Sequence, residues 1–135
     1  MPLTYLRYLP LLAAATLLTL APDLAFAQKA EPSRIQFPRG STGAVVKGVL
    51  RDRQDQEYAG SGVQAQKLEL WLRSSPAGSA ALKVFGGKGT EIPLERVNGG
   101  GLRAPLRESG DFVIVVSRVP RTRGRSKFSL AIEIR

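Results

Sequence analysis

Apolar and polar residues alternate through much of the chain after residue 33, and few folds can accommodate this period of two. Segment 67–73 shows it most clearly, because Leu68, Leu70 and Leu72 share one face of an extended chain. Two later segments repeat the pattern without an internal Gly or Pro, and their apolar faces consist of Phe112, Ile114 and Val116, and of Phe128, Leu130, Ile132 and Ile134. Both segments are rich in residues that favour strands, so we expect β-structure to build the core.

Segments rich in Gly and Pro divide the rest of the chain into short runs. Turns are expected at 74–79, 86–89 and 98–101, and further strands at 33–37, 44–50, 56–60, 80–85 and 91–94. Gly48 interrupts one of these strands and suggests a bulge, while Pro93 places the last one at a sheet edge. About eight strands and no amphipathic helix longer than two turns predict an all-β fold, a small single-domain antiparallel β-sandwich of the jelly-roll type.

The first 27 residues have the three parts of a bacterial secretory signal. Arg7 supplies a basic start, an apolar run follows from residue 9 to residue 20, and Ala25-Phe26-Ala27 provides a small-x-small cleavage site. The run is shorter than the roughly 20 apolar residues of a membrane span, which disfavours an uncleaved anchor. We expect cleavage of a signal peptide, 1–27, and export of the chain to the periplasm or into the medium.

The mature chain is expected to be one small basic domain. Residues 28–33 are polar and are expected to form a flexible tether, which leaves 34–135 as the folded domain. The removed segment carries one basic and one acidic residue, so the mature chain keeps the whole net charge of +9. Cysteine is absent, and the exported domain must therefore be stabilised by its core alone.

The missing residue types exclude several kinds of catalysis. The chain contains no His and no Cys, which rules out an imidazole base, a thiolate nucleophile and the usual zinc sites. Hydrolysis of a glycan by a pair of carboxylates remains open. The acids are scattered among basic neighbours and no pair stands out, so we expect a binding protein without catalytic residues, metal or cofactor.

A basic segment between the two last strands is the first candidate for binding. It contains Arg118, Arg121, Arg123, Arg125 and Lys127, with no acid between them. Guanidinium groups suit carboxylates and phosphates, so the segment either attracts anions or is an ordinary solvated loop. Export and the lack of interleaved aromatic residues argue against nucleic acid as the ligand.

Two further features have both a structural and a functional interpretation. Ser109-Gly110-Asp111 is ordinary turn chemistry that runs directly into a core strand. Tyr58 and Trp71 are each expected more often in the core or in cross-strand packing than on a ligand platform. Trp71 lies opposite the leucine face of its strand, so it is either covered by a second layer or exposed for binding.

A characteristic spacing connects three runs of the chain. These are Tyr58-x(8)-Lys67-Leu68-x-Leu70, then Leu106-x-x-Ser109-Gly110-Asp111-Phe112-x-Ile114-x-Val116, and finally Phe128-x-Leu130-x-Ile132-x-Ile134. In this spacing the chain resembles the bacterial pre-peptidase C-terminal-like domains, which are small secreted β-sandwiches. Within that group it is most similar, over 35–134, to the periplasmic inhibitors of g-type lysozyme, which have a Ser-Gly-x-aromatic turn before an arginine-rich loop.

The resemblance implies a function and the residues that carry it. In those inhibitors a Ser-Gly loop enters the lysozyme cleft, supported by a tyrosine and by arginines of the following loop. The matching positions are Ser109 and Gly110, Tyr58, and Arg118 and Arg121, with Arg123 or Arg125 as alternatives because Pro120 interrupts the loop. The partner is then a secreted lysozyme, whose catalytic glutamate would accept a hydrogen bond from Ser109.

The chain departs from the family pattern at two places. Phe112 stands where a tyrosine is usual, and Ala65-Gln66 replaces a Gly-Gln pair. The implied mechanism also places one geometric demand on the fold. The loop with Ser109 and the arginine-rich loop must lie at the same end of the sandwich. If they lie at opposite ends, the two loops cannot occlude one cleft, and only an exported basic β-domain remains of this hypothesis.

Net charge keeps a second function open. A protein of charge +9 repels a cationic enzyme, so an inhibitor of this charge needs an acidic or locally acidic target. The alternative is a non-enzymatic envelope module that binds an anionic polymer, such as lipopolysaccharide or acidic glycan, through Arg118–Lys127. A carboxylate-dependent glycan hydrolase is the third hypothesis.

Overall fold

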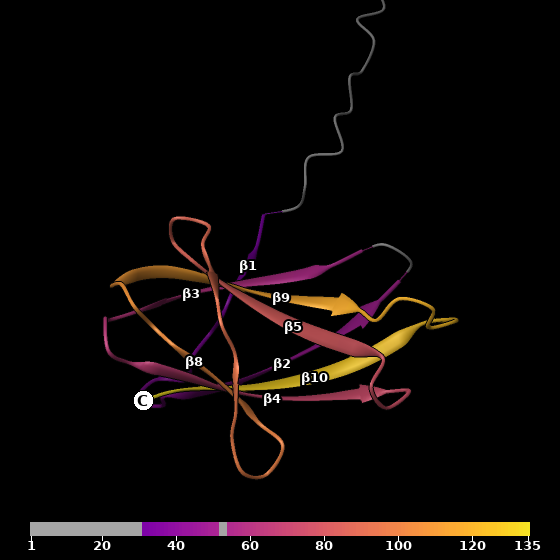
Figure 1. The fold of residues 1–135 in the computed structure, drawn as a ribbon. Helices are drawn as coiled ribbons and strands as arrows, with labels where there is room; N and C mark the ends of the chain where they lie inside the picture. The colour runs from indigo at the N-terminus through magenta and orange to yellow at the C-terminus, as the bar shows by residue number, and fades with distance from the viewer. Residues whose placement is uncertain (1–30, 52–53) are drawn as a thin grey trace, which may run out of the picture.

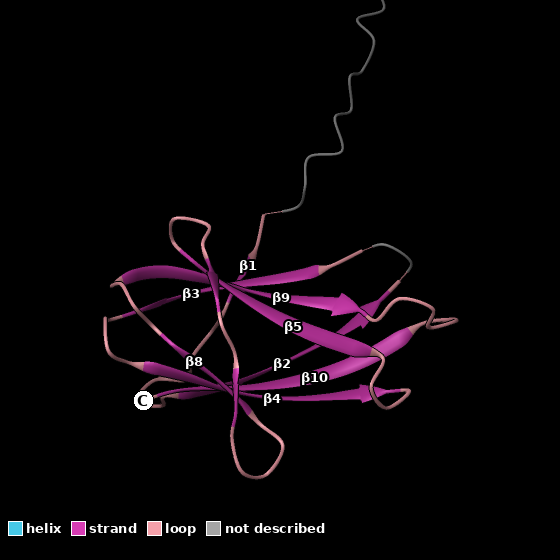
Figure 2. Cartoon of the chain, viewed as in Figure 1, coloured by secondary structure: helices cyan, strands magenta, loops and turns pink. Residues whose placement is uncertain are grey.

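The computed structural model describes residues 31–51 and 54–135, and the expected signal peptide, 1–27, lies outside these ranges (Figure 1). The described residues form ten strands and no helix. Figure 2 shows the strands in magenta and the loops in pink. The strands are β1 (Ser33–Arg34), β2 (Gly43–Leu50), β3 (Gln56–Gly62), β4 (Lys67–Ser75), β5 (Ala80–Gly86), β6 (Glu91–Ile92), β7 (Glu95–Arg96), β8 (Leu102–Pro105), β9 (Gly110–Arg118) and β10 (Ser126–Ile134). Among these residues there is accordingly no helical segment with the length and hydropathy of a membrane span.

The strands form two sheets that stack as the two layers of a sandwich (Figure 1). One layer, which we call the β9 sheet, has the order β1-β3-β9-β5-β6, and the other, the β10 sheet, has the order β2-β10-β4-β8-β7. Neighbouring strands run antiparallel, except that β1 pairs with β3 in parallel. The expected β-sandwich is therefore confirmed.

Because apolar and polar residues alternate along the strands, the apolar side chains face the inside of this sandwich and the polar ones face outward. Fully buried side chains come from both sheets, and the largest of them are Phe112, Leu50, Leu68, Leu70, Ile114, Leu130 and Ile132. Burial of one such side chain contributes about 1.5–3 kcal/mol to the free energy of unfolding. The apolar faces predicted for 67–73, 112–116 and 128–134 are thus the faces that hold the two layers together.

The sequence pattern does not predict two of the ten strands. β7 and β8 flank the Gly-rich turn at 98–101 and extend the β10 sheet beyond β4. Both are short and contain few apolar residues, which is why alternation does not reveal them. The strand expected at 33–37 is reduced to β1, although Ile35 beyond its end is buried.

The bulge expected at Gly48 is wrong. β2 pairs with β10 without interruption, and Gly48 lies opposite Phe128. A Cβ atom at Gly48 would lie 2.7 Å from two atoms of the Phe128 ring, closer than real Cβ contacts come. The glycine therefore leaves the space that this ring fills in the core.

Substituting Gly48→Ala tests this close packing. The added methyl group overlaps the Phe128 ring, which must move, so we expect the free energy of unfolding to fall by about 1–3 kcal/mol. Gly43→Ala on the same strand is the matched control, because its Cβ would meet the nearest atom at 3.6 Å, an ordinary contact. Urea denaturation measures both variants. Similar stability of the two would contradict the packing that we describe.

Candidate functional site

The loop between β8 and β9 presents Ser109 at one end of the sandwich, at the left in Figure 1. Residues 107–111 are exposed there, while Leu106 and Phe112 on either side are buried. Gly110 has a φ angle of 132°, which L side chains rarely adopt, and no atom lies within 4 Å of the position of its missing Cβ. Glycine is therefore needed at this position for its backbone conformation and not to make space.

Three hydrogen bonds fasten this loop to the turn between β3 and β4. The backbone N–H of Leu106 donates to the carbonyl of Gln66 at 2.8 Å, and the N–H of Ala65 donates to the carbonyl of Leu106 at 3.0 Å. The third bond runs from the backbone N–H of Gln64 to Oγ of Ser109, at 2.9 Å. Backbone groups hold every one of these contacts on the turn side, so the loop has little freedom to move relative to the sheet.

The hydrogen bond from Gln64 determines what the Ser109 hydroxyl can do. A serine hydroxyl has one proton to donate and two lone pairs to accept with. Oγ uses one lone pair on Gln64 and donates to no described residue. Since Ser109 is exposed, its O–H is available to a carbonyl or carboxylate oxygen of another molecule.

A hollow of about 460 Å³ opens beside Ser109, between the β8–β9 loop and the turn that joins β5 to β6. Buried apolar side chains line it together with polar residues of the two walls, and these apolar residues are Ile92, Leu106 and Phe112. Lys88 on one wall and Glu108 on the other form an exposed ion pair at 3.6 Å. An exposed pair of this kind contributes little to stability.

Asp111 follows directly on this loop and is held by two neighbours. Ser61 Oγ donates to Asp111 Oδ1 at 2.6 Å, and Arg34 Nη2 donates to Ser61 Oγ at 2.7 Å. Arg34 Nη1 also lies 3.6 Å from Asp111 Oδ1. The hydrogen bond from Ser61, followed by the charge of Arg34, lowers the pKa of Asp111 below its ordinary value of 3.8.

Tyr58 lies in the core and not at this surface. Only 8% of it is exposed, it pairs with Ile114 in the middle of the β9 sheet, and its ring meets the edge of Phe128 at a centroid distance of 6.3 Å. Burial raises the pKa of its hydroxyl. Direct contact of Tyr58 with a partner, as the resemblance implies, is excluded by this burial, and the core interpretation is the correct one.

The arginine-rich segment lies at the other end of the sandwich from Ser109. Ser109 precedes the first residue of β9 and Arg118 is the last, so a strand of nine residues separates them. Such a strand is about 30 Å long. Figure 1 shows the two loops at the left and right ends of the molecule. The expectation that Ser109 and the arginines meet on one surface is therefore wrong, because both flank the same extended strand.

The arginines nevertheless form a distinct basic end. The loop 119–125 is joined to the β4–β5 turn by a hydrogen bond from the N–H of Val119 to the carbonyl of Ser79, at 2.8 Å. Arg118 is half-buried at its start. Three exposed residues of the loop make no ion pair within the ranges that the structure describes, and these are Arg121, Arg123 and Arg125.

The structure adds two residues to the Ser109 end that the sequence pattern did not reveal. Arg107 is exposed on the same loop, two positions before Ser109, and makes no ion pair with any described residue. The sequence could have indicated this role of Arg107, because the residue lies inside the run from Leu106 to Phe112. Gln64 acts through its backbone N–H, and no pattern of side chains predicts such a contact.

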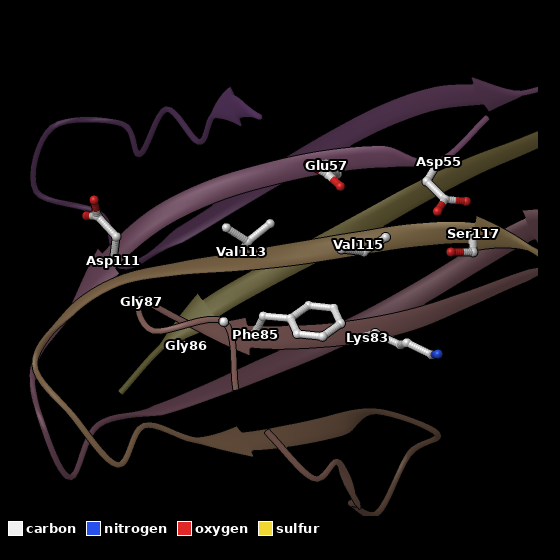
Figure 3. A pocket seen from close by; sticks show the side chains of 11 residues that line it. Asp55, Glu57, Lys83, Phe85, Gly86, Gly87, Asp111, Val113, Val115 and Ser117 are labelled. Carbon is white, nitrogen blue, oxygen red and sulfur yellow. The ribbon is translucent and has the colours of Figure 1, made fainter. Parts of the chain in front are cut away.

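A second hollow, of about 520 Å³, lies on the outer face of the β9 sheet (Figure 3). The apolar side chains of Phe85, Val113 and Val115 follow its length. Charged side chains lie at its margins, and these are Asp55, Glu57, Lys83 and Asp111. The described residues contain no cluster of three acids that could hold a metal. A general acid needs a raised pKa, and the pKa of Asp111 is shifted the opposite way, so Asp111 does not suit that role.

Comparison with known proteins shows a shared fold. No protein-family model matches the chain, and a search of curated proteins finds no match. PliG of Aeromonas hydrophila, a periplasmic lysozyme inhibitor of g-type lysozyme, superposes with a TM-score of 0.63 at 21% identity and covers 77% of this chain and 96% of its own. PliG of Salmonella Typhimurium superposes with a TM-score of 0.64 at 21% identity and covers 78% of this chain and 99% of its own. A mutant of the Escherichia coli inhibitor superposes with a TM-score of 0.59 at 20% identity and covers 77% of this chain and 97% of its own. The described domain therefore has the fold of these inhibitors over nearly their whole length.

The pKa of Asp111 provides a test of the contacts that hold β1 and β9 at this end. Ser61→Ala and Arg34→Ala should each raise this pKa, because the hydrogen bond from Ser61 and the charge and hydrogen bond of Arg34 all lower it. Since the folded value is lowered, stability from this carboxylate is present above the unfolded value and is lost as the pH falls through the folded one. Carboxyl-carbon NMR during an acid titration measures all three proteins. A pKa at or above 3.8 in the unmodified protein, or no rise of the pKa in either variant, would contradict these contacts.

Proposed function

We propose that the protein is exported to the periplasm and inhibits g-type lysozyme by inserting the β8–β9 loop alone, without the arginine-rich loop, into the active-site cleft. One observation carries the proposal. Ser109 is exposed at the tip of a fastened loop, and its Oγ accepts a hydrogen bond from the backbone, which leaves its proton for a partner. The fold shared with three PliG inhibitors supports the choice of target.

The loop has the properties that an occluding element needs. Its backbone is held by the β3–β4 turn, so little conformational entropy is lost when it enters a cleft. The hydroxyl of Ser109 would donate to the catalytic glutamate of the lysozyme, whose buried carboxylate requires a hydrogen-bond donor. Arg107, on the same loop, is placed to supply the positive charge that the distant arginines cannot bring to this surface.

The distribution of charge answers the objection that a +9 protein repels a cationic enzyme. At the Ser109 end, Glu108 and Asp111 lie beside Lys88 and Arg34, so the local charges largely compensate each other. The arginine-rich loop lies about 30 Å away along β9. At physiological ionic strength charges are screened over about 8 Å, so this loop hardly affects an enzyme that approaches the other end.

Substituting Ser109→Ala in residues 28–135 tests the proposed contact. Loss of one hydrogen bond to a buried carboxylate costs about 1–2 kcal/mol, which corresponds to a roughly 5- to 30-fold weaker inhibition constant. The measurement is the rate at which g-type lysozyme hydrolyses a peptidoglycan suspension in the presence of each variant.

Arg107→Ala and Arg123→Ala are the matched pair for this experiment, because each removes one exposed guanidinium from a different end. We expect Arg107→Ala to weaken inhibition and Arg123→Ala to leave it within about twofold. Unchanged inhibition by Ser109→Ala, or a larger loss in Arg123→Ala than in Arg107→Ala, would contradict the proposal.

A further inference from the structure

The outer face of the β10 sheet carries an apolar row in the middle of a charged surface. Ala131 on β10 pairs with Val45 on β2 and with Trp71 on β4, so the three side chains lie next to one another across the strands. Val45 is 63% exposed, and no strand of the part of the chain that the structure describes covers this face. An exposed apolar row on an otherwise polar surface indicates a binding site when its surroundings favour a particular ligand.

Trp71 is neither buried in a second layer nor freely exposed. One edge of its indole lies against the β7–β8 loop, since a Cβ atom at Gly101 would come within 2.6 Å of its Nε1 atom. The tip of that loop, Gly99 and Gly100, stands over the sheet and forms the wall of a hollow of about 430 Å³. The Nε1 edge of the indole is therefore covered by the loop, and the rest of the side chain contributes to the lining of this hollow.

Cations occupy the next rows of the same face. Ser129, one of the residues that line the hollow, pairs with Lys47 on one side and with Arg73 on the other, and both are exposed. Lys127 lies one row further along β10, towards the basic loop 119–125. None of the three cations forms an ion pair with any described residue.

The acids of this face lie on the far side of Trp71 from these cations, and two of them are paired. Glu69 and Glu133 form the row on the other side of Trp71. Arg103 lies 3.3 Å from Glu69, and Arg135 lies 2.9 Å from Glu133. Glu95 continues this row on β7. The half of the face that adjoins the hollow therefore carries the uncompensated positive charge, and the acids lie in the other half.

We propose that this face binds an acidic glycan, with a sugar ring against the indole of Trp71 and its anionic groups on Arg73 and Lys47. A sugar offers an apolar ring face to an aromatic side chain and hydroxyl groups to Ser129. The guanidinium of Arg73 binds carboxylate, sulfate or phosphate through two parallel hydrogen bonds. The hollow falls within the about 300–1,000 Å³ of ligand pockets.

The shape of the site favours a glycan over an anionic membrane. Aromatic residues that anchor a protein to a bilayer protrude so that they reach the acyl boundary. Trp71 is instead recessed between the sheet and the β7–β8 loop, where a flat bilayer cannot follow it. We therefore assign the binding of an anionic polymer to the outer face of the β10 sheet. This face adjoins the arginine-rich loop and lies away from Ser109.

Trp71 also provides the measurement, because it is the only tryptophan of the chain. We expect its fluorescence to change and saturate when oligogalacturonate is added to residues 28–135, and to remain unchanged with a chitooligosaccharide of the same length. The dissociation constant should rise steeply with salt concentration, as counterion release requires for an anionic ligand. Ser109→Ala should bind as the unmodified protein does, which separates this site from the proposed inhibitory loop.

Substitution of the cations identifies the surface. Arg73→Ala and Lys47→Ala should each weaken the binding at least about tenfold, whereas Lys83→Ala, on the outer face of the other sheet, should leave it within about twofold. Unfolding midpoints of all variants establish that any loss is not a loss of fold. The proposal is overturned by the absence of a saturable change, by an equal response to the neutral oligosaccharide, by equal losses in all three variants, or by binding to anionic vesicles alone.

Discussion

β9 sets both the packing of the core and the distance between the two ends of the molecule. Its inner face consists of Phe112, Ile114 and Val116, and β3 and β5 pair with it on either side. A shift of one residue in this register would turn all three side chains outward, so the core specifies the register strongly. The same strand begins directly after Ser109 and ends at Arg118. The packing that stabilises the fold therefore also determines where each candidate binding residue lies.

The sequence was sufficient to predict the layers of the fold because alternation is a local signal. Leu68 and Leu70 face inward for the same reason that every second residue of a half-buried strand does. The short strands β7 and β8 are too brief to show this signal. β8 is instead held by its pairing with β4, and the loop that joins the two strands is held by the packing of Trp71 on Gly101. The glycine at position 48 could be explained only once the opposite ring of Phe128 was known.

The candidate site was predictable only in part. The turn from Leu106 to Phe112 was identified from its composition and from the resemblance, whereas its attachment to Gln64 depends on a contact between residues 45 positions apart. The grouping of Ser109 with the arginines failed for a reason that the sequence already contained. Two loops that flank one extended strand of nine residues cannot meet at the same end, whatever the remaining topology.

The sandwich thus offers two separate surfaces with different electrostatics. At the Ser109 end, the charges of Glu108 and Asp111 are compensated by neighbours, and a backbone-fastened hydroxyl is the distinguishing group. The basic half of the β10 sheet has cations around a recessed indole instead. A small domain without cysteine can hold two such surfaces apart because continuous strands connect them. Each surface can therefore change without disturbing the other.

Hydrogen exchange of the protein bound to a g-type lysozyme tests the central claim most directly. If the β8–β9 loop enters the cleft, the backbone amides of 63–66 and 106–110 exchange more slowly in the complex than in the free protein. The amides of 119–125, at the far end of β9, then exchange at unchanged rates. Slower exchange confined to 119–125, or no change at 106–110 in a formed complex, would contradict the account.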